Sequence, residues 1–176
     1  MRTETVTLYK FSELSDAAKA RAVTDYRTSE DYHFAEDAMG SIKALAEHFH
    51  GRVSDWSIDW LNSSPSSMRF NMPEDMERVE IQTRLDQLGT FNPDTLKGDG
   101  DCKLTGYCAD EAAIDGFRAA FMAGESDLAV LMPAGYQTWL KDTQSDAEYQ
   151  FSLEGYAEHA EANAREFTED GDRWPR

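Results

Sequence analysis

Short segments of strictly alternating apolar and polar residues are interspersed with longer segments of helical periodicity, and this mixture most limits the folds open to the chain. Residues 53–61 alternate most clearly, because tryptophan and isoleucine side chains occupy one side of the extended chain while Asp55 and Asp59 occupy the other. A turn at 62–67 and renewed alternation at 68–72 complete the pattern of an antiparallel hairpin. Three further segments alternate and are predicted to be strands: 4–10, 102–107 and 148–153.

Helical periodicity is strongest between residues 31 and 50, where apolar side chains line one face and Gly51 follows as a stop signal. The predicted buried face consists of Phe34, Ala38, Ile42, Leu45 and Phe49. Further helices are predicted from a cap at Ser12 or Ser15 to about Arg27, over 73–89, from a cap at Asp110 to Gly124, over 127–141 and over 156–169. Because the helices and strands lack regular βαβ spacing, we expect an α+β fold. It would be a single domain spanning residues 1–176, with a mainly antiparallel sheet of about four to five strands and helices packed on one face.

The size and composition of the chain indicate a folded protein. It has 176 residues, the size of one ordinary domain, and 40% of them are hydrophobic and 11% aromatic, which is too many for a disordered acidic tail. No apolar run reaches the ~20 residues that cross a bilayer, and residues 1–6 lack the basic flank and apolar stretch of a signal peptide. We therefore expect a soluble protein of the cytoplasm.

Negative charge is the strongest feature of the composition. The chain carries 34 acidic against 17 basic side chains, a formal net charge of -17. The excess is uneven, because residues 1–100 carry 18 acids against 11 bases while residues 101–172 carry 16 against 4. Such a protein repels nucleic acid and anionic membranes and attracts basic surfaces, with an association rate that falls as salt rises. Two explanations remain open: acidity that serves solubility or a salty habitat, and acidity that serves a specific basic partner.

The two cysteines indicate neither a disulfide nor a zinc site. If residues 102–108 form a strand, Cys102 and Cys108 share one face about 20 Å apart, which is too far for a disulfide. The four histidines do not fall at a metal-binding spacing with them. We interpret both cysteines as small buried apolar residues in a reducing compartment.

Asp99 and Asp101 flank a glycine, which raises the question of a metal or phosphate loop. An EF-hand loop needs further acidic residues at alternate positions, and Lys103 stands at one of these positions instead. The phosphate-loop pattern is absent, and two aspartates would repel an anion. Since Asp-Gly is typical of tight turns, we interpret the segment as a turn before a strand. A single divalent ion between Asp94, Asp99 and Asp101 is the remaining alternative.

The sequence contains no recognisable catalytic constellation. It has no Gly-x-Ser-x-Gly segment, no His-Glu-x-x-His segment and no cysteine with a clear histidine partner. Pairs of carboxylates are uninformative in a chain with 34 acidic residues. We therefore predict that the protein is not an enzyme and has no catalytic residues, cofactor or metal site.

The last predicted helix carries three glutamates on one side. At 100° per residue, Glu154, Glu158 and Glu161 gather opposite the predicted apolar face, which consists of Tyr156, Ala160, Ala164 and Phe167. Glu154 and Glu158 form a like-charge pair at i,i+4, which costs the helix a few tenths of a kcal/mol. One interpretation is a solvated face supported by an ion pair between Glu161 and Arg165; the other is a face kept acidic for a partner.

Two segments carry a resemblance to a known group of proteins. Residues 8–27 (LYKFSELSDAAKARAVTDYR) and 98–121 (GDGDCKLTGYCADEAAIDGFRAAF) resemble a family of small acidic phage and prophage proteins. That family opens with a Tyr-x-Phe-x-Glu-Leu-Ser-x-x-Ala-Lys segment and later has a Gly-Asp-Gly turn. The two segments cover about a quarter of the chain, and its middle does not match. The family has no established activity, but phage-encoded acidic proteins of this size include anti-CRISPR proteins and other DNA mimics.

The resemblance and the charge together imply an inhibitor encoded by a phage and acting in the bacterial cytoplasm. It would block a nucleic-acid-dependent defence system by binding a basic nucleic-acid-binding host protein or complex, with carboxylates replacing phosphates opposite lysine and arginine. Direct binding of nucleic acid or membrane is not expected. The candidate contact residues are Asp55, Asp59, Asp99, Asp101, Glu154, Glu158 and Glu161. The alternatives are an antitoxin-like protein that neutralises a basic toxin and a small metal-dependent enzyme.

Overall fold

The computed structural model describes residues 6–88 and 104–174 and divides the chain into two compact units. Unit 1 consists of Met1–His33 and Asp146–Arg176, and unit 2 consists of Phe34–Ser145. The boundary before Asp146 falls inside a helix and not at a linker. The interpretation of the whole chain as one domain stays a prediction.

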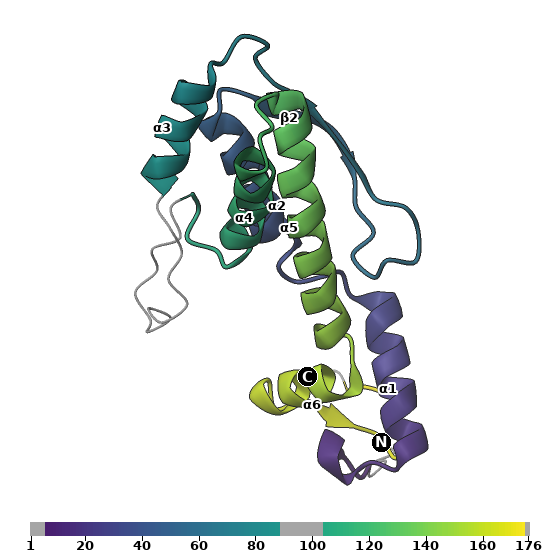
Figure 1. Cartoon of the computed structure of the whole chain (residues 1–176). Helices are drawn as coiled ribbons and strands as arrows, with labels where there is room; N and C mark the ends of the chain where they lie inside the picture. The colour runs from purple at the N-terminus through teal and green to yellow at the C-terminus, as the bar shows by residue number, and fades with distance from the viewer. Residues whose placement is uncertain (1–5, 89–103, 175–176) are drawn as a thin grey trace, which may run out of the picture. The chain divides into compact units, whose positions relative to one another are not determined.

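Helices make up most of the described structure (Figure 1). In chain order the elements are β1 (Tyr9–Lys10), the 3-10 helix η1 (Phe11–Glu13), α1 (Asp16–Ser29), α2 (Ala35–His48), β2 (Arg52–Ser57), β3 (Ser67–Asn71), α3 (Arg78–Leu88), α4 (Ala109–Met122), α5 (Leu128–Gln150), α6 (Leu153–Ala162) and β4 (Glu166–Phe167). The predicted α+β class is confirmed, but the predicted sheet is wrong. The described strands form two separate two-stranded sheets, β1 with β4 and β2 with β3, and most buried apolar side chains belong to the helices.

Helices α2, α4 and α5 form the core of unit 2. The indole N–H of Trp139 in α5 donates to the Ala38 carbonyl oxygen of α2 over 3.0 Å, and Trp139 is fully buried. Gly116 of α4 faces α5, and a Cβ there would lie 2.7 Å from the Ala134 carbonyl oxygen. The absence of a side chain at this position therefore permits the close approach of α4 and α5.

The predicted hairpin is confirmed by β2 and β3, which pair antiparallel with Trp56 opposite Met68. β2 packs against α2, so the hairpin is anchored on the core of unit 2. Trp56 is 48% exposed, however, although its position in the alternation predicts burial. The strand also ends earlier than predicted, at Ser57, and Asp59 lies in the loop that follows.

Unit 1 has an aromatic core between η1, α1, α6 and β4. The ring of Phe11 packs edge-on against Tyr156 and Phe167, with centroids 5.2 and 5.7 Å apart. Tyr26 of α1 lies 4.5 Å from Tyr156, measured between ring centroids. Ser15, one of the two predicted caps, begins α1 by accepting a backbone N–H of the first turn over 3.2 Å. These contacts bring the two ends of the chain together in one unit.

Three predicted strands differ from the structure. Residues 148–153 are not a strand, because α5 continues to Gln150 and α6 begins at Leu153. In the predicted strand Tyr149, Phe151 and Leu153 share one face, but only Phe151 is buried, and Tyr149 and Leu153 are 43% and 54% exposed. Among the described residues of the predicted strand 4–10, only Tyr9–Lys10 forms a strand, which pairs with β4. Residues 104–107 are irregular, and the rest of the predicted strand 102–107, including Cys102, lies outside the described residues.

The helix predictions hold in type but not at every end. Phe34 is 42% exposed, while the other four residues of the predicted face of α2 are fully buried. His50, with φ of 59°, and not Gly51, adopts the left-handed conformation after this helix. Helix α3 begins at Arg78 and not at the predicted Pro73, because the hydrogen bonds of its first turn run back to Glu77.

The ends of the last three helices also differ from prediction. Cys108, and not Asp110, is the N-cap of α4. Helix α5 extends nine residues past the predicted end at Lys141, to Gln150, and contains Pro133 in its first two turns. Helix α6 is shorter than predicted, because Phe167 belongs to β4.

None of the described helices combines the length and the apolar character that a membrane crossing requires.

Candidate functional site

Helix α6 presents a stripe of carboxylates, which we call the α6 carboxylates: Glu154, Glu158 and Glu161. Ser152 caps the helix by accepting the Gly155 N–H over 3.1 Å. The buried side of the helix carries Tyr156 and Ala160, which are 2% and 1% exposed, whereas all three glutamates are exposed. The predicted orientation is confirmed for Tyr156 and Ala160, whereas Ala164 is exposed beyond the end of the helix and Phe167 belongs to β4. At 100° per residue the three glutamates lie within an arc of about 60°.

No lysine or arginine among the described residues neutralises the α6 carboxylates. Among the residues that the structure describes, none of the three forms an ion pair with a lysine or arginine. The ion pair expected between Glu161 and Arg165 is absent there, because the Arg165 guanidinium lies over the Tyr26 ring, 5.7 Å from its centroid. Glu158 accepts a hydrogen bond from the Tyr149 hydroxyl, which raises the pKa of that tyrosine. The negative charge of the stripe is thus available to a partner.

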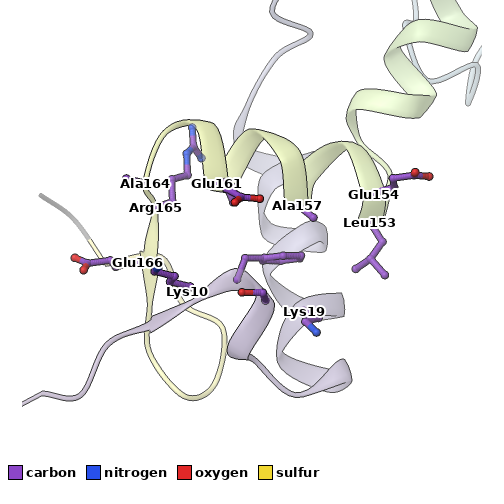
Figure 2. A pocket seen from close by; sticks show the side chains of 12 residues that line it. Lys10, Lys19, Leu153, Glu154, Ala157, Glu161, Ala164, Arg165 and Glu166 are labelled. Carbon is purple, nitrogen blue, oxygen red and sulfur yellow. The ribbon is translucent and has the colours of Figure 1, made fainter.

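A groove of about 620 Å³ in unit 1 runs beside this stripe, and we call it the α6 groove (Figure 2). Its lining residues are Lys10, Phe11, Ser12, Lys19, Leu153, Glu154, Ala157, Ala160, Glu161, Ala164, Arg165 and Glu166. Two of the α6 carboxylates, Glu154 and Glu161, belong to this lining. The volume lies within the range of about 300–1,000 Å³ that is common for binding pockets.

The α6 groove has an apolar floor between charged sides. Phe11 of η1 and the alanines of α6 supply the apolar surface, and Leu153 leaves 54% of its surface exposed at one end. Lys10 and Lys19 come from β1 and α1, whereas Glu154 and Glu161 come from α6. The groove can therefore hold an apolar surface and meet charges of both signs at its edges.

The other predicted contact residues do not form an acidic sheet face. Asp55 is exposed on β2, but its partner across the ladder is Arg69. Asp59 lies beyond the strand, where its carboxylate accepts the Ser63 hydroxyl over 2.6 Å and the Leu61 N–H over 3.0 Å. The bond from Ser63 lowers the pKa of Asp59, so this aspartate stabilises the hairpin loop. Asp99 and Asp101 lie outside the described residues.

The basic side of the groove is not among the sites predicted from the sequence. Lys10 and Lys19 give no signal in the sequence, because only the fold of unit 1 places them beside α6. A signal for the α6 side does exist: Leu153, Ala157 and Ala164 recur at helical spacing and could have been read as a second apolar stripe.

A second cluster of polar aromatic groups lies elsewhere in unit 1. The Tyr26 hydroxyl lies 2.7 Å from His33 Nε2, and the rings of His33 and His159 stack with centroids 5.4 Å apart. Burial, followed by the charges of Arg165 and His33, lowers the pKa of His159. No group of three or more metal-ligating side chains is found in the part of the chain that the structure describes. The cluster borders the aromatic core of unit 1, because Tyr26 is buried, His159 is partly buried and His33 is exposed.

Comparison with protein-family models, with curated protein sequences and with solved structures gave no match to this chain.

Proposed function

We propose that this chain is a phage-encoded, anti-CRISPR-like inhibitor of a bacterial nucleic-acid-dependent defence system. It binds a basic nucleic-acid-binding surface of a host protein or complex through the α6 carboxylates. The phage origin rests on the sequence resemblance of residues 8–27 and 98–121. The choice of binding site rests on the exposed α6 stripe. Its three like charges lie together without an ion-pair partner in the described structure.

The charge spacing of the stripe suits a surface that binds a single nucleic-acid strand. Glu154 and Glu161 are seven residues apart, about 10 Å along the helix axis, so the stripe carries one charge per about 5 Å. One DNA strand carries a phosphate per about 3.4 Å, and the two strands of a duplex together carry one per about 1.7 Å. The stripe is therefore closer in charge density to one strand than to a duplex. Lysine and arginine side chains spaced for a single strand would meet these carboxylates.

The fixed geometry of the stripe also supports specific binding. The three glutamates project from one helix whose opposite side is held in the aromatic core by Tyr156. A partner would not have to order the backbone of this helix on binding, which reduces the entropic cost of association. Long-range attraction by the -17 net charge would raise the association rate, and this contribution falls as salt rises.

A capture experiment from bacterial host lysate tests the proposal. The tagged full-length chain should retain a nucleic-acid-binding complex at low salt, and single-stranded DNA or RNA should displace it. Binding should weaken strongly near 1 M salt, where the screening length is about 3 Å. Reversing the charges of the stripe (E154K/E158K/E161K) should reduce capture about tenfold or more without unfolding the protein, because all three side chains are exposed.

A second charge reversal of equal size provides the control. Asp25, Glu47 and Asp86 are exposed on α1, α2 and α3 and form no ion pair among the described residues, so D25K/E47K/D86K changes the net charge equally. This variant should lose far less binding than the α6 variant. Equal losses would show that diffuse charge, and not the α6 stripe, attracts the partner. Capture that resists both polyanion and salt, or that yields a basic toxin without a nucleic-acid site, would contradict the proposed function.

A further inference from the structure

We infer that the α6 groove binds an amphipathic helix of the partner protein, with an apolar face flanked by basic residues on one side and acidic residues on the other. This inference deepens the proposed function and rests on it, because the same α6 carboxylates contact the partner. Nucleic-acid mimicry alone needs only the charges. The groove adds an apolar contact beside them and therefore predicts what kind of element the partner inserts.

The wall of the groove has the length and spacing of a helix-binding surface. The α6 residues of the lining, from Leu153 to Glu161, recur every three or four positions and cover about two turns, or about 12 Å; Ala164 lies beyond the end of the helix. Helices pack on one another through ridges with this spacing. A partner helix of about eight residues or more matches this length.

The floor of the groove allows close approach. Ala157 of α6 and Ala164, just beyond the helix, contribute only methyl groups to the lining (Figure 2), and Phe11 of η1 adds apolar surface. Small residues let two helices approach to the short end of the usual 8–10 Å between axes. Leu153, more than half exposed, stands at the start of the helix, where an apolar side chain of the partner would cover it. Covering that leucine removes apolar surface from water, which favours binding.

The groove carries Lys10 and Lys19 on one side and Glu154 and Glu161 on the α6 side, while Arg165 and Glu166, which follow α6 in the chain, add one charge of each sign at one end (Figure 2). Lys10 and Lys19 form no ion pair among the described residues, and neither do Glu154 and Glu161 on the α6 side. An occupant that lies between them would therefore gain on both sides, with its basic flank toward α6 and its acidic flank toward the lysines. The geometry resembles a coiled coil in this respect, where charged flanks select the partner.

Other occupants fit the groove less well. An extended peptide that adds a strand needs a free sheet edge, but the β1–β4 sheet contributes only Lys10 and Glu166 to the lining, and the long wall is a helix whose backbone groups bond internally. An anionic membrane surface would be repelled by the three α6 carboxylates. A fatty acid could place its carboxylate on Lys10 or Lys19, but it would leave Glu154 and Glu161 unmatched.

Binding of designed peptides to the full-length chain tests the inference. The probes are fluorescent 15-residue helical peptides with leucines at helical spacing and three flank patterns: one basic and one acidic flank, two basic flanks, and two acidic flanks. A fourth peptide replaces the leucines of the mixed-flank peptide with serine. The mixed-flank peptide should bind about threefold or more tighter than the two-basic peptide, and much tighter than the other two.

Substitutions on the protein distinguish peptide binding in the α6 groove from non-specific binding elsewhere on the surface. A157R fills the groove with a long cation and should weaken the mixed-flank peptide about tenfold or more, whereas A162R, on an exposed position of α6 outside the lining, should not. K10E/K19E should reverse the preference, so that the two-basic peptide binds tighter than the mixed one. Far-UV circular dichroism checks folding, and L153A, at an exposed leucine, supplies a milder second variant if A157R is misfolded.

The possible results separate this inference from the proposed function. Equal binding of the serine peptide, insensitivity to both A157R and L153A, or an unchanged flank preference in K10E/K19E would overturn the groove inference. Two other results would also overturn the groove inference, because each indicates a different occupant. These are self-association of the protein that A157R abolishes, and displacement of the peptide by a fatty acid that binds with higher affinity. If lysate capture still shows polyanion competition in any of these cases, the proposed function stands without the groove. Selective peptide binding without such capture would leave the groove inference standing and contradict the proposed function.

Discussion

Substituting Asp110 with asparagine should destabilise unit 2 substantially, although the change is nearly isosteric. Asp110 is completely buried in the first turn of α4. Its carboxylate accepts three hydrogen bonds from the preceding loop: from the Thr105 N–H over 2.8 Å, the Thr105 hydroxyl over 2.8 Å and the Gly106 N–H over 3.1 Å. The carboxylate therefore fixes the loop that leads into the helix, and a neutral amide would hold it less well.

The expected loss can be built from these contacts. An asparagine oxygen keeps the two backbone bonds, but a bond to a charged acceptor contributes about 1.5–3 kcal/mol against about 0.5–1.5 for a neutral one, so each weakens by about 1 kcal/mol. Removing the charge from the first turn of α4 costs about 0.5 kcal/mol more. Asp110→Asn should thus lose about 2–3 kcal/mol, or about 5–10 °C in Tm for a chain of this size. Asp110→Ala, which removes all three bonds, should lose more.

Urea unfolding followed by circular dichroism measures this loss, and amide hydrogen exchange at Thr105 and Gly106 locates it. The control is Asp115→Asn on the same helix, where the carboxylate is half exposed and pairs with Arg118 at 3.2 Å; it should cost less than about 0.5 kcal/mol. If Asp110→Asn behaves like Asp115→Asn and both loop amides stay protected, the carboxylate does not hold the loop.

Two further predictions concern Gly116 in α4 and His159 in α6. Gly116→Ala should lower the free energy of unfolding by about 1 kcal/mol. Crowding of the new methyl group against the Ala134 carbonyl costs about 1–3 kcal/mol and outweighs the gain of about 1 kcal/mol in helix propensity. Urea unfolding measures the change, and a stabilised variant would refute the close packing of α4 and α5. Burial, with the charges of Arg165 and His33, lowers the pKa of His159, so the unfolded state binds its proton more readily and stability should fall as pH decreases below about 6.5. The slope between pH 7.5 and 5.5 should be smaller in His159→Gln, and an identical slope would show that this histidine does not contribute.

The distribution of charge bears on both explanations of the acidity. Exposed acidic side chains occur on every described α-helix, as expected if charge serves solubility. Only a few are paired with the chain's own cations in the described structure, for example Asp172 with Arg21 at 2.6 Å and Glu30 with Arg173 at 3.3 Å. The α6 stripe differs because it borders a groove with an apolar floor. Solubility alone does not require that arrangement.

The local pattern of the sequence determined most of the helices and the β2–β3 hairpin. Ala18, Ala22 and Tyr26 recur every fourth residue and are buried in α1, and α2 buries its periodic face in the same way. A helix places residues three and four apart on one side, so these faces can be recognised without knowing what covers them. The exposure of the α6 carboxylates follows from the same local rule.

Only the tertiary structure decided where short alternating segments go and what the α6 stripe faces. Alternation over residues 148–153 fits a strand, but Phe151 is buried between two helices, and no neighbouring strand is present among the described residues to pair with it. Asp59, an acidic contact candidate in the sequence, is used by the hairpin loop. Lys10 and Leu153 are far apart in the chain and line the same groove. Such juxtapositions depend on long-range packing, whereas periodicity records only which side of its own element a residue occupies.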